Sequence, residues 1–152
     1  MVSALFDTNI VVDALMKRHP WASEANLLLE AVTRAEIRAC ISASALTDIF
    51  YICRKAVGVA PARQAVARCL TIFEILVVDE MLIREAMALP IDDVEDAVQV
   101  ACAVRGGLDV IVTRDARGFA LSPIPALTPA ALLAQLGIAP ISPSSGPTSQ
   151  SP

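Results

Sequence analysis

Hydrophobic and polar residues alternate along the chain in blocks that predict strands separated by helices. Short apolar runs predict five strands: Ser3–Phe6, Arg38–Ser42, Glu74–Val78, Asp109–Thr113 and Pro125–Leu127. Apolar residues at helical spacing predict seven helices: Ile10–Met16, Ala22–Ala35, Ser44–Val57 with Ser44 as its cap, Ala62–Phe73, Glu80–Leu89, Asp92–Arg105 and Pro129–Leu136. Strands that alternate with helices are typical of an α/β fold, here a three-layer sandwich with a mainly parallel central sheet.

The composition favours a single domain with an aliphatic core. Hydrophobic residues make up 55% of the 152 residues and aromatic residues only 4%, so Ala, Val, Leu and Ile must fill the core. After Gly137 the sequence turns to proline, serine and glycine. We therefore expect one domain over residues 1–137 and a disordered tail over residues 138–152.

Prolines and an early acid argue against a membrane protein. The stretch from Gly118 to Pro152 carries no charge, but prolines break it before the roughly 20 apolar residues of a membrane span can accumulate. Asp7 interrupts the first apolar segment, which also lacks the basic start of a signal peptide. We expect a soluble, cytoplasmic protein that does not bind a membrane.

Charge and cysteine content narrow the classes of function further. A net charge of −4 and a pI near 4.9 have the wrong sign for a protein that coats DNA through Lys and Arg. Nucleic-acid chemistry is still open to such a chain if its acids gather around cations. The four cysteines stand singly in apolar segments, and we interpret them as small buried hydrophobes rather than disulfide partners or metal ligands.

Two acids follow predicted strands directly. Asp7 comes after the first strand, and Asp115 lies two residues beyond Thr113, at the end of the fourth. Ligands bind at the carboxyl ends of the strands in parallel sheets. Asp7 and Asp115 are therefore expected to face each other if their strands are near neighbours, although either one alone is equally well explained as a surface-loop acid.

Two further acids stand in predicted helices. Asp48 lies inside a helix that is apolar on nearly every side, where a carboxylate needs a salt bridge, a hydroxyl or a cation to compensate its burial. Asp96 is the last acid before the buried run Ala97–Ala101. Asp93 and Glu95 can support Asp96 or an ion from the rim, whereas Asp92 is explained by ordinary capping.

Four separate predicted elements thus each supply one acid whose position is hard to explain on its own: Asp7, Asp48, Asp96 and Asp115. Carboxylates gathered in one pocket repel and raise one another's pKa, a penalty that a hard divalent cation removes. Because His and Cys ligands are lacking, the pattern indicates Mg²⁺ or Mn²⁺ rather than Zn²⁺.

Four motifs, in this order, resemble the PIN-domain nucleases, of which the toxins of VapBC toxin–antitoxin pairs are the largest group. They are Phe6-Asp7-Thr8-Asn9, Ser44-Ala45-Leu46-Thr47-Asp48-Ile49, Asp93 to Gln99, and Thr113-Arg114-Asp115 with Phe119 after it. The likeness covers roughly residues 2–136. It implies that Asp7, Asp48, Asp96 and Asp115 line a divalent-metal site that cleaves RNA.

The resemblance also implies roles for the neighbouring residues. Asp7, Asp96 and Asp115 would ligate the ion, Asp48 would ligate it or position a water, and Thr8, Asn9 and Thr113 would steady the acids. Four cations flank the same sheet edge and are expected to guide the RNA backbone, although each one singly is equally well explained as a solvated charge: Lys17, Arg18, Arg114 and Arg117. A metal-activated water would then attack the phosphodiester in line.

The sequence departs from the family at two positions. The second acid is commonly Glu, so Asp48 is one methylene shorter, and Gly118 stands where many relatives carry a further acid. A PIN fold that only binds RNA or a protein therefore stays open as an alternative. A phosphotransferase of the haloacid-dehalogenase type does not fit, because Asn9 occupies the position of its second acid.

Partners are expected on two grounds. Apolar surface on the helices around residues 22–35 and 43–73 favours a homodimer. The resemblance adds a small antitoxin that inserts into the site.

Overall fold

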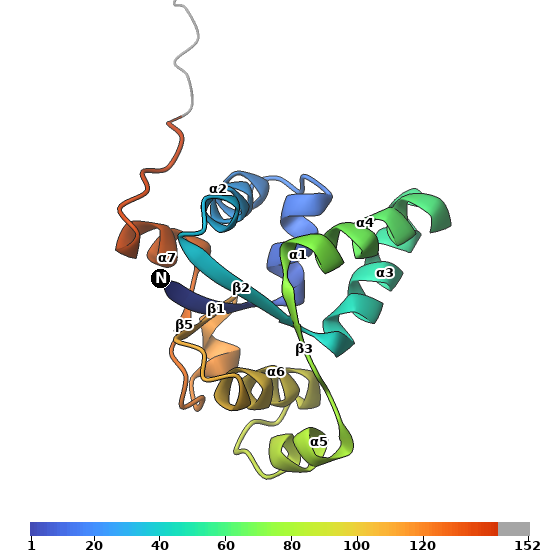
Figure 1. Cartoon of the computed structure of the whole chain (residues 1–152), viewed down its shortest axis with the longest axis vertical. Helices are drawn as coiled ribbons and strands as arrows, with labels where there is room; N and C mark the ends of the chain where they lie inside the picture. The colour runs from blue at the N-terminus through green and yellow to red at the C-terminus, as the bar shows by residue number, and fades with distance from the viewer. Residues whose placement is uncertain (143–152) are drawn as a thin grey trace, which may run out of the picture.

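The computed structural model describes residues 1–142 and contains a five-stranded sheet in which every pairing is parallel. The strand order is β3-β2-β1-β4-β5, so β1 lies at the centre (Figure 1). The strands are β1 (Val2–Phe6), β2 (Ile37–Ser42), β3 (Glu74–Leu76), β4 (Val110–Val112) and β5 (Ala126–Leu127). The predicted α/β fold with a parallel central sheet is confirmed.

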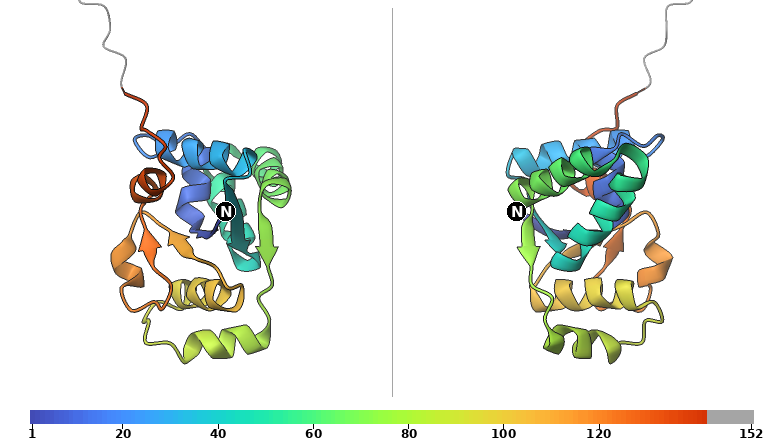
Figure 2. Two further views of the ribbon diagram at one scale, coloured as in Figure 1. Left: turned by 60° about the vertical axis from the view of Figure 1, so that its left-hand side comes forward. Right: turned by 90° about the vertical axis from the view of Figure 1, so that its right-hand side faces the viewer.

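Helices cover both faces of the sheet and make it the middle of three layers (Figure 2). The first face carries α1 (Thr8–Leu15), α2 (Ala22–Thr33), α3 (Ala43–Val57), α4 (Val59–Ile72) and α7 (Pro129–Gln135). The second carries α6 (Val94–Arg105), with α5 (Glu80–Met87) packed outside it, and the short 3₁₀ helix η1 (Ala116–Phe119) beside it.

Alternation along the strands divides the core into two parts. Ala4 and Phe6 of β1 pack into the cluster under α1–α4 and α7, whereas Leu5 packs into the cluster under α5 and α6. All three side chains are fully buried. A strand buried on both faces favours apolar residues at successive positions, which explains the run Ala4–Phe6 before Asp7. The buried Ser3 of β1 is accommodated because its hydroxyl donates to Asp109 Oδ2 at 2.8 Å.

Three predicted element boundaries are wrong for local reasons. The cap of α3 is Ser42, whose hydroxyl accepts from the Ala45 amide at 3.2 Å, and not Ser44. The cap of α6 is Asp93 rather than Asp92, which lies outside the helix. The apolar run Glu74–Val78 forms only the three-residue edge strand β3, because it has a single partner strand.

Three other expectations can be compared with the structure. All four cysteines are buried and free. None of the helices in residues 1–142 is long and apolar enough to cross a bilayer. The proposed domain boundary at residue 137 stays a prediction, and most of the expected tail lies outside the described residues.

Candidate active site

The candidate site lies where the chain leaves β1 and β4. Phe6 pairs with Val112, so Asp7 and Thr113 emerge side by side from adjacent parallel strands. The chain leaves β1 for helices on one face and reaches β4 from a helix on the other (Figure 2). Such a point of divergence leaves a crevice at the carboxyl ends of the strands, which is the usual ligand position in open α/β sheets.

Asp7 occupies the N-cap position of α1, but its carboxylate makes no capping hydrogen bond. Its Oδ2 accepts from the Thr113 hydroxyl at 2.8 Å, and its Oδ1 accepts from Gln99 Nε2 at 3.1 Å. The caps Ser42, Asp79, Asp93 and Thr128 all bond their own helices. The Asp7 carboxylate is instead held across the crevice by β4 and α6.

Asp115 and Asp96 complete the β4 side of the site. The Asp115 amide donates to the Thr113 hydroxyl at 3.1 Å, which links Asp115 to Asp7 through one threonine. A Cβ built on Gly118 would lie 3.1 Å from Asp96 Oδ2 and 3.8 Å from Asp115 Oδ2. The absence of a side chain at residue 118 therefore leaves room between these two carboxylates.

The electrostatics of Asp96 reflect this crowding. Burial, followed by the charges of Asp93, Asp7 and Asp115, raises the pKa of Asp96 to about 6. Its backbone amide donates to the capping carboxylate of Asp93 at 2.9 Å. Asp96 is thus an acid at a helix N-terminus that still holds its proton unusually well.

Asp48 and Glu95 lie on the α3 side of the site. They line a cavity of about 290 Å³ together with Thr8, Asn9, Tyr51 and Ile52. Burial first, and then the charges of Asp48 and Asp7, raise the pKa of Glu95. Asp48 is half-buried and forms no salt bridge to Arg54 or Lys55 in the described structure, so its charge faces Glu95 without a cation between them.

A family model described as PIN domain matches residues 3–117. The chain belongs to the PIN domain family. A comparison with curated proteins finds no match. The resemblance to PIN domains read from the four motifs is therefore confirmed by an independent comparison.

Solved structures with this PIN fold include components of toxin–antitoxin complexes. A VapBC2 complex from Rickettsia felis bound to a DNA fragment from their promoter is 20% identical, with a TM-score of 0.65 over 84% of this chain and 98% of that one. A toxin–antitoxin complex from Klebsiella pneumoniae is 26% identical, with a TM-score of 0.62 over 83% and 97%. VapC20 from Mycobacterium tuberculosis, described as a Sarcin-Ricin loop cleaving toxin, is 16% identical, with a TM-score of 0.63 over 92% and 99%.

The acids of this PIN domain approach one another without meeting at one point. In residues 1–142, no three Asp, Glu, His or Cys side chains are grouped closely enough to hold one ion. The chemistry of the site nevertheless fits a hard cation, because all its side-chain donors carry oxygen and the buried Gln99 Oε1 and Thr8 Oγ1 have no hydrogen-bond partner. Mg²⁺ is usually bound by one or two carboxylates and several waters. Such coordination suits the spacing of these acids better than three direct carboxylate ligands.

Of the four predicted RNA-backbone cations, two are held by a buried acid. Asp13 of α1 is fully buried, with Arg18 NH2 at 2.8 Å from its Oδ1 and Arg114 Nε at 3.0 Å from its Oδ2. Lys17 and Arg117 are exposed, and neither forms an ion pair within residues 1–142. The expected guiding role of all four stays a prediction.

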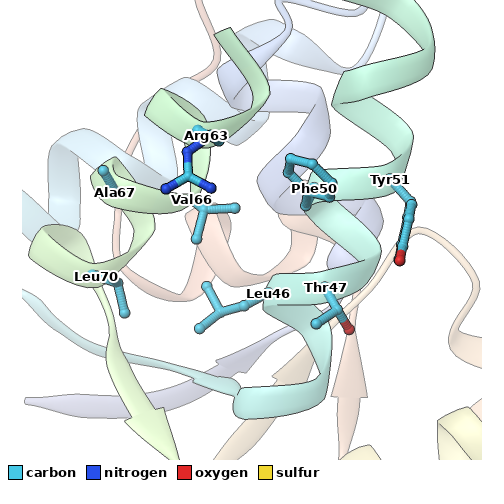
Figure 3. A pocket seen from close by; sticks show the side chains of 8 residues that line it. All are labelled: Leu46, Thr47, Phe50, Tyr51, Arg63, Val66, Ala67 and Leu70. Carbon is cyan, nitrogen blue, oxygen red and sulfur yellow. The ribbon is translucent and has the colours of Figure 1, made fainter. Parts of the chain in front are cut away.

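An apolar cavity of about 460 Å³ lies between α3 and α4 (Figure 3). Leu46 and Phe50 of α3 face Val66 and Leu70 of α4 across it. Tyr51 lines both this cavity and the smaller one that contains Asp48 and Glu95. Tyr51 therefore borders both the apolar cavity and the acidic side of the site.

Two residues of the site were not assigned roles from the sequence. Gln99 lies in the quoted acidic-helix motif, and a polar residue inside the buried run 97–101 is the signal that points to it. Asp13 gives the same signal, since it stands among Val11, Val12 and Ala14 in a helix whose neighbours are buried. Its partner Arg114 is supplied by tertiary structure and could not be identified from spacing, whereas Arg18 lies only five residues further along the chain.

Proposed function

We propose that this PIN domain is a Mg²⁺- or Mn²⁺-dependent endoribonuclease and the toxin of a toxin–antitoxin pair. The observation that carries the proposal is the setting of Asp7. Its carboxylate is turned away from its own helix toward Thr113 and Gln99, and its charge is one of those that raise the pKa of Asp96. In residues 1–142 no cationic side chain is ion-paired with Asp7, Asp48, Asp96 or Asp115.

In this proposal Asp7, Asp96 and Asp115 hold the divalent ion, directly or through water, and Asp48 orients a water from the α3 side. The ion, when bound, supplies a water of lowered pKa and offsets the charge that develops on the phosphate. Thr113 and Gln99 hold both oxygens of Asp7, so the carboxylate needs little reorganisation when the ion arrives. Asn9 is exposed at the rim, where its amide can contact the scissile strand.

Support for a protein partner comes from the relatives and from one surface. The structures from R. felis and K. pneumoniae are of toxin–antitoxin complexes. The cavity between α3 and α4 offers an antitoxin an apolar surface, and its lining residue Tyr51 also lines the smaller cavity that contains Asp48. A homodimer, expected from apolar surface on the same helices, agrees with the exposure of Tyr51, Val57, Val59 and Leu70.

The test is cleavage of single-stranded and structured RNA by the full-length chain with Mn²⁺, Mg²⁺ or EDTA. We expect cleavage with either metal and none in EDTA, and loss of cleavage in Asp7→Asn and Asp96→Asn. Asp92→Asn is the matched control, because Asp92 lies outside α6 and is not among the acids proposed to hold the ion. Unchanged cleavage by Asp7→Asn, with thermal unfolding showing a folded protein, would overturn the proposal.

The second candidate is a PIN domain that binds RNA or a protein without cutting. The specific observation in its favour is that no three acids are grouped tightly in residues 1–142. Titration calorimetry with Mn²⁺ separates the two functions, since the nuclease must take up metal at its acids whereas the binding module need not. Mn²⁺ uptake that disappears in Asp96→Asn favours the nuclease.

A further inference from the structure

We propose that Trp21 and Arg114 form a platform on which an unpaired base of the RNA substrate stacks. The inference rests on the proposed ribonuclease function and assigns it a substrate contact. Trp21 is the only tryptophan of the chain and precedes α2 directly. The residue is 43% exposed, so part of this large aromatic side chain is accessible to a ligand.

The indole ring is already stacked on one side. The guanidinium carbon of Arg114 lies 3.9 Å from the ring centroid, a distance typical of a cation–π contact. The residue as a whole is 43% exposed, which leaves indole surface accessible beyond the face that Arg114 covers. In the proposed platform the base stacks on the face opposite Arg114.

Asp13 holds the platform in place. Its fully buried carboxylate lies 3.0 Å from Arg114 Nε and 2.8 Å from the NH2 group of Arg18. Arg18 Nε also donates to Asp13 Oδ1 at 2.8 Å. An arginine anchored on a buried acid loses little further freedom when a ligand arrives, so a base that stacks on Trp21 meets a preorganised surface.

The platform adjoins the proposed catalytic acids. Arg114 stands between Thr113, which bonds Asp7, and Asp115, and successive Cα atoms are about 3.8 Å apart. The Thr113 side chain meets Asp7 at the end of β1, whereas the next side chain, Arg114, meets Asp13 of α1 and Trp21. The ring therefore lies against Arg114 on the α1 side, and in this proposal it receives a nucleotide that flanks the scissile phosphate.

Charge and ring chemistry favour RNA as the occupant. Two arginines share one carboxylate, so these three side chains together carry one positive charge in an otherwise acidic protein. A ribose-phosphate chain supplies the negative charge, and its unstacked bases supply flat rings for the free indole face. The platform adds no base-edge hydrogen bonds of its own, so we expect it to accept any base, with purines favoured by their larger stacking area.

The single tryptophan makes binding directly observable. We would titrate full-length Asp7→Asn protein, which cannot cleave in the proposed mechanism, with short single-stranded RNA and follow tryptophan fluorescence in Mg²⁺. Quenching that saturates with RNA is expected. A fluorescence signal that stays constant while RNA binding is detected by another method, such as anisotropy of a labelled RNA, would overturn the platform.

Substitutions then distinguish stacking from structural support. Trp21→Leu should raise KM for RNA cleavage about ten-fold with little change in kcat, which corresponds to the loss of one stacked base, whereas Trp21→Phe should recover most of the affinity. RNA with an abasic residue at the stacking position should be bound equally by wild type and Trp21→Leu. If no abasic position removes the difference between these two proteins, Trp21 acts only through the fold and the proposal is wrong.

The outcomes separate this inference from the proposed function. If the wild type cleaves RNA but the fluorescence of Trp21 does not change when RNA binds, the platform is wrong and the proposed nuclease function stands. Absence of both cleavage and RNA binding overturns both. An emission maximum of Trp21 that shifts on dilution without RNA would show that a second copy of the chain covers the ring, and it would replace the RNA platform with a protein interface.

Discussion

The Thr113 hydroxyl donates to Asp7 Oδ2 at 2.8 Å and accepts from the Asp115 amide at 3.1 Å. One side chain thus fixes the relative positions of two acids that lie on neighbouring strands and 108 residues apart in the numbering of the chain. The hydroxyl can serve both because an O–H group donates once and accepts through its lone pairs. Threonine at the end of β4 therefore couples the geometry of Asp7 to that of Asp115.

Substitution of Thr113 tests this coupling. Thr113→Val keeps the shape but removes both hydrogen bonds, and we expect RNA cleavage to fall about 10- to 100-fold, as for other residues that orient metal ligands. Thr113→Ser keeps the hydroxyl and should retain most of the activity. Steady-state kinetics with Mn²⁺ checks both variants, and equal activity of the valine and serine proteins would contradict the coupling.

Gln99 provides the second contact of Asp7 and a way to separate stability from function. Its Nε2 donates to Asp7 Oδ1 at 3.1 Å, while its buried Oε1 has no partner. Gln99→Met removes a hydrogen bond and an unsatisfied buried oxygen together, so we expect a change of less than about 1 kcal/mol in the free energy of unfolding. Mn²⁺ affinity should fall, because the Asp7 carboxylate loses one of the two hydrogen bonds that hold it. Calorimetry and urea unfolding measure the two effects on one protein, and an undiminished Mn²⁺ affinity would remove Gln99 from the site.

The sequence predicts the fold and the identity of the acids better than it predicts their arrangement. Periodicity indicates the strands and helices because burial on both faces of β1 demands an apolar run, and the order of motifs indicates the family. The boundaries at Ser42 and Asp93 were missed because adjacent polar residues compete for one cap, and only the backbone decides between them. The pair of Asp13 and Arg114 joins residues whose proximity depends on packing of α1 against the end of β4. No local pattern reports that proximity.

The pKa of Asp96 leads to a pH dependence with a definite sign. Burial and the charges of Asp93, Asp7 and Asp115 raise this pKa from 3.8 to about 6, so the native state binds the proton more tightly than the unfolded chain. In EDTA the contribution of Asp96 to the free energy of unfolding is therefore fully present below pH 3.8 and is lost as the pH rises through about 6. Glu95, whose pKa is also raised, acts in the same direction.

Mn²⁺ affinity should have the opposite trend and rise across the same interval, since the ion competes with the proton. Denaturant unfolding and calorimetry at several pH values measure the two trends. Asp96→Asn should flatten both, and Asp92→Asn should leave them unchanged. A stability that rises between pH 4 and 6 in EDTA for the wild type alone, and not for Asp96→Asn, would contradict the assigned pKa shift of Asp96.

Substitution of Gly118 tests whether Mn²⁺ binding needs the space between the carboxylates of Asp96 and Asp115. A Cβ at this position would lie 3.1 Å from Asp96 Oδ2, closer than a side chain normally tolerates, and 3.8 Å from Asp115 Oδ2. We expect Gly118→Ala to displace the Asp96 carboxylate and to weaken Mn²⁺ binding several-fold without unfolding the protein. Ala120→Gly, in the same segment, is the control for a general effect on η1. Wild-type Mn²⁺ affinity in Gly118→Ala would show that Asp96 does not need this space.

The buried acid Asp13 should contribute much more to stability than the exposed ion pairs. Asp13→Asn leaves Arg18 and Arg114 without their counter-charge. We expect a loss of about 3 kcal/mol, the lower end of the range for breaking a buried pair, because both arginines keep partial contact with solvent. The exposed pair of Glu80 and Arg84 is the control, since Glu80→Gln removes an equally short contact of 2.7 Å that water screens. Urea unfolding compares the two variants, and near-equal midpoints would mean that Asp13 does not anchor α1 to the end of β4.

Asp13→Asn should also affect RNA binding, because Arg114 is part of the proposed platform. We expect this variant to show weaker RNA-induced quenching of Trp21 fluorescence, an effect that Glu80→Gln should not produce.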